Sequence, residues 1–225
     1  MSELIEISTF TLKINSPVPP PTLISSLKLL SSAPGLIAIY FGPHIESPTT
    51  YTTVTRWSSQ ASRDAFFNVR SPTWQSSFTA SLETLSVFSS SPSSSSSSSS
   101  SSDDSGQDAA IPLGAPCTEI FFSFGADEDY LENRLNPFVK AITSAKLPGL
   151  FGGFTAEFVP VKCVGVEKPE PKTVVLMMGW NSKADHEAQK GQGTGELFPN
   201  DFPPLYRELD TMRIVKSKRT DSISD

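Results

Sequence analysis

A run of serine divides this sequence into two segments with similar patterns. Ser93 to Ser102 is unbroken serine, and the residues around it are also rich in serine. Such a run has no apolar side chain whose burial could offset the entropy that is lost when a backbone is ordered. The sequence therefore predicts a flexible linker between two folded units. The expected boundaries are residues 1–88 for the first unit, 89–116 for the linker, 117–217 for the second unit and 218–225 for a disordered tail.

The first unit alternates between strand and helix patterns. Leu23, Leu27 and Leu30 have the spacing of one apolar helical face, and two short helices are expected to begin near Ser59 and Ser71. Segments rich in β-branched and aromatic residues indicate strands. The expected strands are Leu4–Leu12, Leu36–Phe41, Tyr51–Trp57 and Leu85–Phe88.

The second unit repeats the order of the first. The matching pairs are Glu6–Thr11 with Glu119–Phe124, Ala33–Leu36 with Leu147–Leu150, and Tyr51–Trp57 with Thr173–Trp180. Matches that occur in the same order indicate an internal duplication. The sequence therefore predicts an α+β fold of two ferredoxin-like (split βαβ) repeats. A sheet covered by helices on one face must bury its other face, so the two antiparallel sheets are expected to pack as an intramolecular α/β barrel.

Charge and composition exclude several classes of partner. The formal net charge is −6, and the only cluster of basic residues (Lys216, Lys218 and Arg219) lies near the end of the sequence, so no nucleic-acid partner is expected. No apolar stretch is long enough to cross a bilayer and no secretory pattern is seen, which predicts no membrane partner and a cytoplasmic protein. Cys117 and Cys163 are expected to be reduced thiols, with a disulfide between them left open.

Several short segments of the first unit are similar to a known superfamily. They are Ala33–Leu36, Ile39–Gly42, Tyr51–Thr53, Trp57 and Ser71–Trp74. Together they resemble the dimeric α/β-barrel superfamily, in particular its stress-responsive A/B barrel and antibiotic biosynthesis monooxygenase branches. In that superfamily two chains normally supply one ferredoxin-like unit each, whereas here one chain would supply both and form a monomer through an internal pseudo-dimer. The resemblance implies a small enzyme without cofactor or metal, a monooxygenase or cyclase that acts on an aromatic or polyketide-like hydrophobic small molecule.

The resemblance also implies catalytic residues. His186 follows Trp180 on an expected helix, where the monooxygenase branch often carries histidine, so His186 is the expected base and Tyr51 the expected hydrogen-bond donor. An exposed helical histidine among charged neighbours is the other interpretation of His186. Thr53 and Trp74 stand where the cyclase branch commonly has histidine, which argues against cyclase chemistry in the first repeat because neither side chain titrates near neutral pH.

The expected substrate-binding residues are Trp57, Trp74, Arg56, Trp180 and His44. The aromatic side chains suit a planar apolar ligand, although core packing would explain most of them equally well. A buried Arg56 would need an anion or a hydrogen-bonding partner. His44 lies in an expected loop, either exposed to solvent or leaning over a pocket. A non-catalytic ligand-binding or stress-related interaction barrel is therefore the alternative function.

Overall fold

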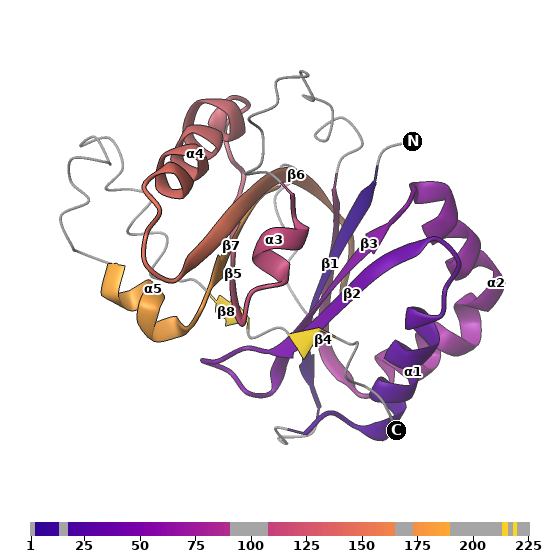
Figure 1. Ribbon diagram of the computed structural model, residues 1–225. Helices are drawn as coiled ribbons and strands as arrows, with labels where there is room; N and C mark the ends of the chain where they lie inside the picture. The colour runs from indigo at the N-terminus through magenta and orange to yellow at the C-terminus, as the bar shows by residue number, and fades with distance from the viewer. Residues whose placement is uncertain are drawn as a thin grey trace.

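The two halves of the chain contain the same order of strands and helices (Figure 1). The computed structural model describes residues 3–13, 18–90, 108–164, 173–189, 213–215 and 218–219. The first half contains β1 (Leu4–Leu12), α1 (Pro21–Ser31), β2 (Leu36–Pro43), β3 (Thr50–Trp57), α2 (Gln60–Thr79) and β4 (Leu82–Ser90). The second half contains α3 (Ala110–Leu113), β5 (Cys117–Phe124), η1 (Leu131–Leu135), α4 (Asn136–Ser144), β6 (Leu150–Val164), β7 (Thr173–Trp180), α5 (Lys183–Gln189), β8 (Arg213–Val215) and β9 (Lys218–Arg219).

The strands form one antiparallel sheet in the order β8-β5-β7-β6-β4-β1-β3-β2-β9. The first repeat contributes β4-β1-β3-β2, and the second contributes the equivalent set β8-β5-β7-β6. β4 pairs with β6 from Leu85 opposite Val164 to Ser90 opposite Phe158, which joins the two repeats. At the other side β8 pairs with β5 and β9 pairs with β2, and these two short strands are near neighbours in the sequence. The inner sheet faces of the two repeats share one buried core, and the predicted fold of two ferredoxin-like repeats packed as an intramolecular barrel is confirmed.

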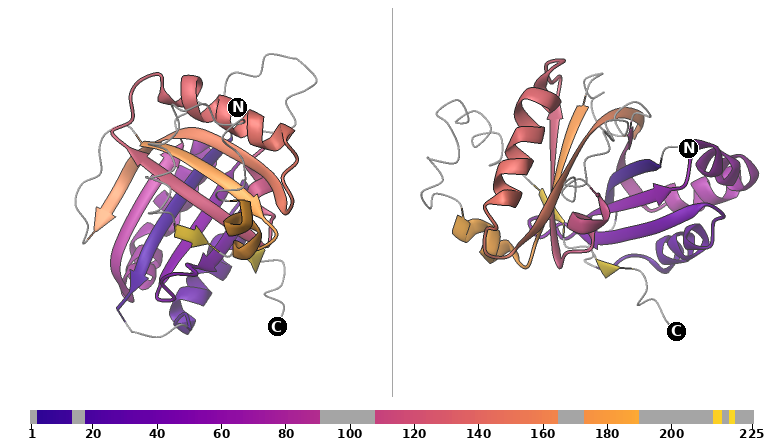
Figure 2. Two further views of the ribbon diagram at one scale, coloured as in Figure 1. Left: turned by 90° about the vertical axis from the view of Figure 1, so that its left-hand side faces the viewer. Right: turned by 45° about the horizontal axis from the view of Figure 1, so that its top comes forward.

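Apolar side chains form three cores. Helices α1 and α2 cover the outer face of the first repeat's sheet, and η1, α4 and α5 cover that of the second (Figure 2). The third core fills the barrel between the two inner sheet faces. Its buried members are Ile5, Ile7, Tyr40, Val54, Phe88, Ala109, Leu113, Ile120, Ala156, Phe158, Val175 and Met177.

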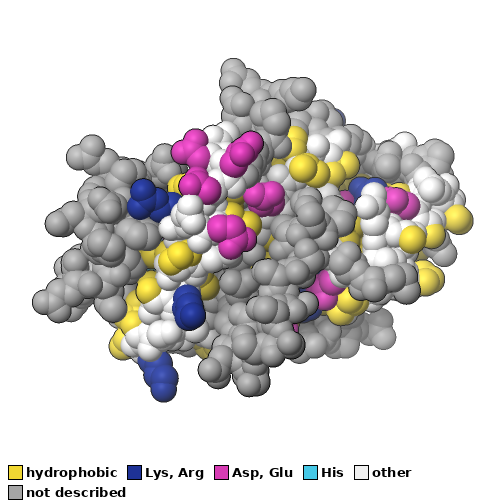
Figure 3. Space-filling model, turned by 90° about the horizontal axis from the view of Figure 1, so that it is seen from above, with side chains coloured by type: hydrophobic (Ala, Val, Ile, Leu, Met, Phe, Trp, Pro, Cys, Tyr) yellow, Lys and Arg dark blue, Asp and Glu magenta, His cyan; other side chains and the backbone are white. Residues whose placement is uncertain are grey.

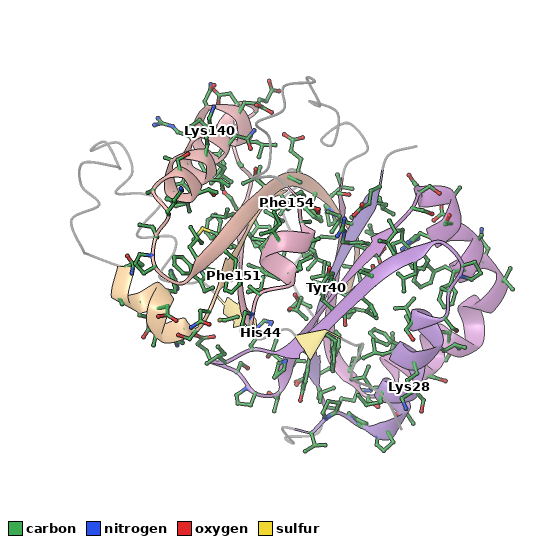
Figure 4. All side chains as sticks on the ribbon, in the orientation of Figure 1. Lys28, Tyr40, His44, Lys140, Phe151 and Phe154 are labelled. Carbon is green, nitrogen blue, oxygen red and sulfur yellow. The ribbon has the colours of Figure 1, made fainter. Side chains whose placement is uncertain are left out.

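The short helix α3 lies inside the barrel, although the sequence assigns it to the linker. Tyr40 from β2 and Phe154 from β6 lie near it (Figure 4), and Leu113 is buried in the barrel core. The Thr118 hydroxyl donates a hydrogen bond of 2.7 Å to the Pro112 carbonyl. Close packing against β7 requires Gly179, because a Cβ there would lie 2.7 Å from the Cα of Pro112. The folded part of the second half thus begins before residue 117.

Three other elements differ from the prediction. The two expected helices near Ser59 and Ser71 form one helix, α2, because Phe66, Trp74 and Phe78 pack on the same sheet face despite the proline between them. The helix expected after the first strand of the second repeat begins with a π-helical turn, η1, which ends two residues before Pro137. The missing N–H of this proline interrupts the α-helical bonding pattern. β9 lies within the segment that was expected to be a disordered tail.

The surface seen from above is acidic over the start of η1. Figure 3 shows acidic side chains gathered there, and the exposed ones in this segment are Asp127, Glu128, Asp129 and Glu132. This face does not suit a phosphate backbone, in agreement with the sequence. Of the helices in the described residues, none is long and apolar enough to span a bilayer.

The repeated Pro-Gly turns have the same backbone geometry. Gly35 and Gly149 both have φ of 79°, a left-handed conformation that strains any residue with a side chain. A Cβ on Gly35 would lie 2.5 Å from the Cβ of Ser62, and one on Gly149 would lie 2.7 Å from that of Asp185. Each glycine thus allows the turn between helix and strand to approach the next helix of its own repeat.

We expect the Gly35→Ala substitution to lower the free energy of unfolding by about 1–3 kcal/mol, because it adds both backbone strain and a steric clash. Urea unfolding followed by circular dichroism measures this change. The control is Ser31→Ala on the exposed end of α1, which we expect to stay within about 0.5 kcal/mol of the wild type. Equal midpoints for both variants would contradict the role given to the glycine.

Candidate ligand-binding site

A cavity of about 320 Å³ lies between the sheet of the first repeat and its two helices. Strands β1, β3 and β4 form its floor, and α1 and α2 form its walls. Val161 from the long strand β6 of the second repeat also lines it. The cavity is at the small end of the range for ligand pockets. Its lining residues are Glu6, Ser8, Leu27, Leu30, Thr53, Thr55, Trp57, Arg63, Phe67, Trp74, Phe78, Thr79, Leu85, Val87 and Val161.

The floor of the cavity carries four polar side chains. Alternation along β1 and β3 directs Glu6, Ser8, Thr53 and Thr55 to the helix-covered face. Glu6 lies opposite Thr55, and Ser8 lies opposite Thr53, in the antiparallel register of the two strands. The four side chains therefore form a compact polar patch within an otherwise apolar core.

An ion pair holds Glu6 against the wall of the cavity. Arg63 on α2 approaches the Oε2 atom of Glu6 with Nε at 2.9 Å and Nη2 at 2.7 Å. The Glu6 residue is only 6% exposed. Burial raises the pKa of the Glu6 carboxyl above its ordinary value, and the neighbouring Arg63 partly opposes that rise. A carboxyl whose pKa is raised inside a cavity is a stronger proton acceptor than an exposed carboxyl.

The other polar groups on the floor differ in their bonding. The Thr55 hydroxyl accepts a hydrogen bond of 3.1 Å from the Trp57 indole. The Thr53 hydroxyl is buried and has no hydrogen-bond partner among the described residues. A buried hydroxyl without a partner is costly, so a donor or acceptor is expected to enter the cavity.

Aromatic rings form the walls. Trp74 and Phe78 on α2 are stacked, with ring centroids 4.9 Å apart, and Phe67 packs edge-on to Trp74. The Trp74 indole donates a hydrogen bond of 3.0 Å to the Ser26 carbonyl on α1, which ties the two helices together. The Arg63 guanidinium lies 4.4 Å from the centre of the Phe67 ring. These contacts give the cavity flat, rigid walls that match a planar ligand.

The second repeat contains an equivalent group of residues. Glu119, Trp180 and His186 occupy the positions that correspond to Glu6, Trp57 and Arg63 in the duplication. The Trp180 indole donates a hydrogen bond of 3.2 Å to Glu119 Oε2, and His186 Nε2 lies 3.4 Å from Glu119 Oε1. Both oxygens of Glu119 therefore have neighbours within their own repeat, and the Glu119 residue is 0% exposed.

The structure separates the predicted site residues into different places. Trp57 and Trp74 line the cavity of the first repeat, and their role in substrate binding stays a prediction. Trp180 and His186 pack together on the second repeat, with ring centroids 5.0 Å apart. His186 is buried, which contradicts the interpretation as an exposed histidine, while its role as a base stays a prediction.

Three of the predicted site residues do not line the cavity, namely Tyr51, Arg56 and His44. Tyr51 is buried and stacks on Phe41 with centroids 5.2 Å apart, and burial raises the pKa of its hydroxyl. His44 is buried rather than exposed in a loop, because its Nε2 atom lies 2.8 Å from the hydroxyl of Thr52, a residue on the barrel side of β3.

Arg56 has protein carboxylates as its partners. It forms an ion pair with Glu3 at the start of the chain and lies 3.3 Å from Asp108, which precedes α3. The hydrogen bond with Glu3 raises the pKa of Arg56, so the guanidinium stays charged. The anion that a buried arginine requires is thus supplied by the protein, and the arginine fixes α3 at one end of the barrel.

Glu6 and Arg63 were not among the residues predicted from the sequence. A single glutamate on a strand and a single arginine on a helix resemble ordinary surface residues. The duplication could have identified Glu6 as a candidate. Glu6 and Glu119 occupy the same position in the two repeats, on strands whose alternate residues are apolar. A charged residue at a core-facing position in both copies indicates a buried functional or structural group.

Comparison with solved structures identifies the same fold in other proteins. An anthrone oxidase-like protein superposes with a TM-score of 0.60 at 11% sequence identity, over 96% of this chain and 93% of the other. A candidate monooxygenase from Lactobacillus acidophilus superposes with a TM-score of 0.52 at 10% identity, over 97% and 94%. A chain described as a candidate chlorite dismutase gives 0.50 at 10% identity, over 97% and 96%.

The coverage of both chains in these pairs means that the two repeats are matched together. This is the dimeric α/β-barrel fold closed within one chain. The three similar chains have names that differ in activity, so the fold by itself does not select a reaction. No family model matches the sequence, and no curated protein matches it in sequence. Within the described ranges, no group of three or more His, Cys, Asp and Glu side chains is placed to hold a metal ion.

The raised pKa of Glu6 predicts a pH dependence of stability. Below the ordinary value of 4.5 the carboxyl is protonated in both the folded and the unfolded chain. As the pH rises above that value, the unfolded chain releases this proton first, which favours unfolding. We therefore expect the wild type to lose stability relative to Glu6→Gln as the pH rises from 4.5 through the raised pKa of the folded state. Urea unfolding across this range is the measurement, with Glu83→Gln on the exposed part of β4 as a control whose difference from the wild type stays constant.

Because Arg56 does not line the cavity, we expect its substitution to lower the stability of the protein but not its affinity for a ligand. We expect Arg56→Met to lower the free energy of unfolding by about 1–3 kcal/mol, because Glu3 and Asp108 lose a charged partner. The affinity for a ligand in the first-repeat cavity should not change. Thermal unfolding and a binding titration on the same preparation test both statements, and a selective loss of affinity would restore the predicted substrate-binding role.

Proposed function

We propose that the protein binds a planar aromatic small molecule of the polyketide type in the first-repeat cavity and oxidises it with molecular oxygen, without a bound cofactor. The observation that carries this proposal is the cavity itself, which combines flat aromatic walls with a buried carboxyl of raised pKa. The similarity of fold to an anthrone oxidase-like protein and to a candidate monooxygenase supports it.

The residues of the cavity support a reaction that begins with loss of a proton from the ligand. An aromatic ring system with an acidic proton becomes electron-rich when deprotonated, and such an anion can react with oxygen directly. In the net reaction of an anthrone, one atom of oxygen becomes a ring carbonyl, and the other leaves as water with the two hydrogens of that ring carbon. Trp57, Trp74 and Phe78 would hold the ring plane, and the polar floor would orient its substituents.

Ligand binding without turnover is the second candidate function. The observation in its favour is that Glu6 and Arg63 are the only ionisable side chains among the lining residues in the described part of the chain, and they are paired with each other. An anthrone that binds in the cavity but does not consume oxygen faster than in buffer would support this alternative.

We expect Val87→Phe to weaken anthrone binding by about tenfold or more and to reduce oxygen consumption in parallel, because the larger ring fills the cavity from its floor. Tryptophan fluorescence and an oxygen electrode provide the two measurements. Val69→Phe is the matched control, since Val69 is 82% exposed on α2 and lies outside the cavity.

If Val87→Phe binds and oxidises anthrone as the wild type does, the cavity is not the site. His186→Ala separates the two repeats in the same assay. Full turnover in that variant would exclude the predicted role of His186 as the base, whereas loss of turnover without loss of binding would move the reaction to the second repeat.

A further inference from the structure

The two oxygens of Glu6 have different surroundings. The contacts from Nε and Nη2 of Arg63 both fall on Oε2, and neither involves Oε1. Glu6 lines the cavity and is almost fully buried, so its carboxyl lies at the edge of an enclosed space. A ligand in the cavity could therefore donate a hydrogen bond to this carboxyl.

A second polar contact is available further along the floor. The unpartnered Thr53 hydroxyl lies beside Ser8, one cross-strand pair beyond Glu6 and Thr55 on the same face. Two residues of a strand span about 7 Å, which is comparable to the width of a fused aromatic ring system. A ligand with polar groups on opposite sides of its rings would therefore meet both points.

The charges of the cavity select the ionisation state of the ligand that enters. Arg63 already contacts Glu6, the Asp64 carboxylate at 3.1 Å and the Phe67 ring, so it offers little to an incoming anion. The buried charge of Glu6 repels a carboxylate. A neutral hydrogen-bond donor is thus favoured over an anion of the same shape.

We propose that the ligand is a neutral hydroxylated aromatic compound whose hydroxyl donates to Glu6 Oε1, and that Glu6 is the group that removes its proton. In this step the ligand O–H bond breaks, a new O–H bond forms on Oε1, and the negative charge moves from Glu6 to the ligand oxygen. The proton moves within the cavity, so the total charge of protein and ligand does not change, and the Arg63 guanidinium lies beside the pair. The inference rests on the proposed ligand site but does not require turnover.

Three surrounding facts agree with this assignment. Burial raises the pKa of the Glu6 carboxyl, which makes it a stronger proton acceptor than an exposed carboxyl. The charged groups that face Glu6 are Arg63 and, next to it, Asp64, both on α2. In the second repeat both oxygens of Glu119 already have neighbours, which confines the proposed role to the first repeat.

The test compares three probes of one ring system, which are naphthalene, β-naphthol and β-naphthoate. Titrations followed by tryptophan fluorescence and calorimetry should give the wild type about a tenfold to hundredfold higher affinity for β-naphthol than for naphthalene, because a hydrogen bond to a charged group contributes in that range. We expect β-naphthoate to bind most weakly.

Glu6→Gln should bind naphthalene as the wild type does, which also shows that its cavity is intact. We expect it to lose most of the preference for β-naphthol and to bind β-naphthoate more tightly than the wild type, because the buried negative charge is gone. Glu83→Gln, on the exposed part of β4, should keep the wild-type order of the three probes.

The outcomes separate this inference from the proposed function. Equal affinities of the wild type for naphthalene and β-naphthol, or an unchanged preference in Glu6→Gln, would overturn the role of Glu6 and leave the cavity as a binding site. If none of the three probes binds, or if Val87→Phe does not weaken their binding, the proposed site itself is wrong.

Discussion

The pairing of β4 with β6 is the interaction on which the rest of the structure depends. Each repeat has a sheet with helices on one face only, so its other face is apolar and must be covered. The bonds between β4 and β6 bring the two uncovered faces together and remove an open edge from each sheet. β6 continues past its pairing with β7, and this extension places Val161 at the cavity of the other repeat. The site of the first repeat is therefore completed by the second.

A barrel built from two repeats of one chain allows the two outer faces to differ. In a barrel of two identical chains, any substitution would appear in both sites. Here the sixth position after the strand-ending tryptophan holds Arg63 in one repeat and His186 in the other. Glu6 lines a cavity, while Glu119 contacts Trp180 and His186. The duplication thus permits one repeat to carry a candidate ligand site, while the equivalent residues of the other repeat pack against one another.

The sequence was sufficient to predict the order of strands and helices and the barrel of two repeats, because periodicity and repeated turns such as Pro34-Gly35 reflect local physics. It was not sufficient for α3, since four residues are too few to show a helical period, and their burial depends on contacts with strands far away in the sequence. The cavity as a whole was not predicted. Trp57 and Trp74 were proposed as binding residues and this stays a prediction, whereas the pairing of Glu6 with Arg63 arises only when α2 packs on β1. The sequence left His44 either exposed or over a pocket, because its neighbour Thr52 is on the next strand.

The pairing of Glu6 with Arg63 is more readily explained by function than by stability. Removing two charges from water costs several kcal/mol per ion, and well-packed apolar residues of the same volume often stabilise a core equally well or better. The arrangement is also incomplete as a structural ion pair, because both contacts of the arginine fall on one carboxylate oxygen. An apolar pair would remove this cost, but it would also remove the carboxyl from the lining of the cavity. A ligand that donates to this carboxyl would offset part of the cost of burial when it binds. In that case the pair contributes to selectivity for hydroxylated rings and lowers the stability of the empty protein.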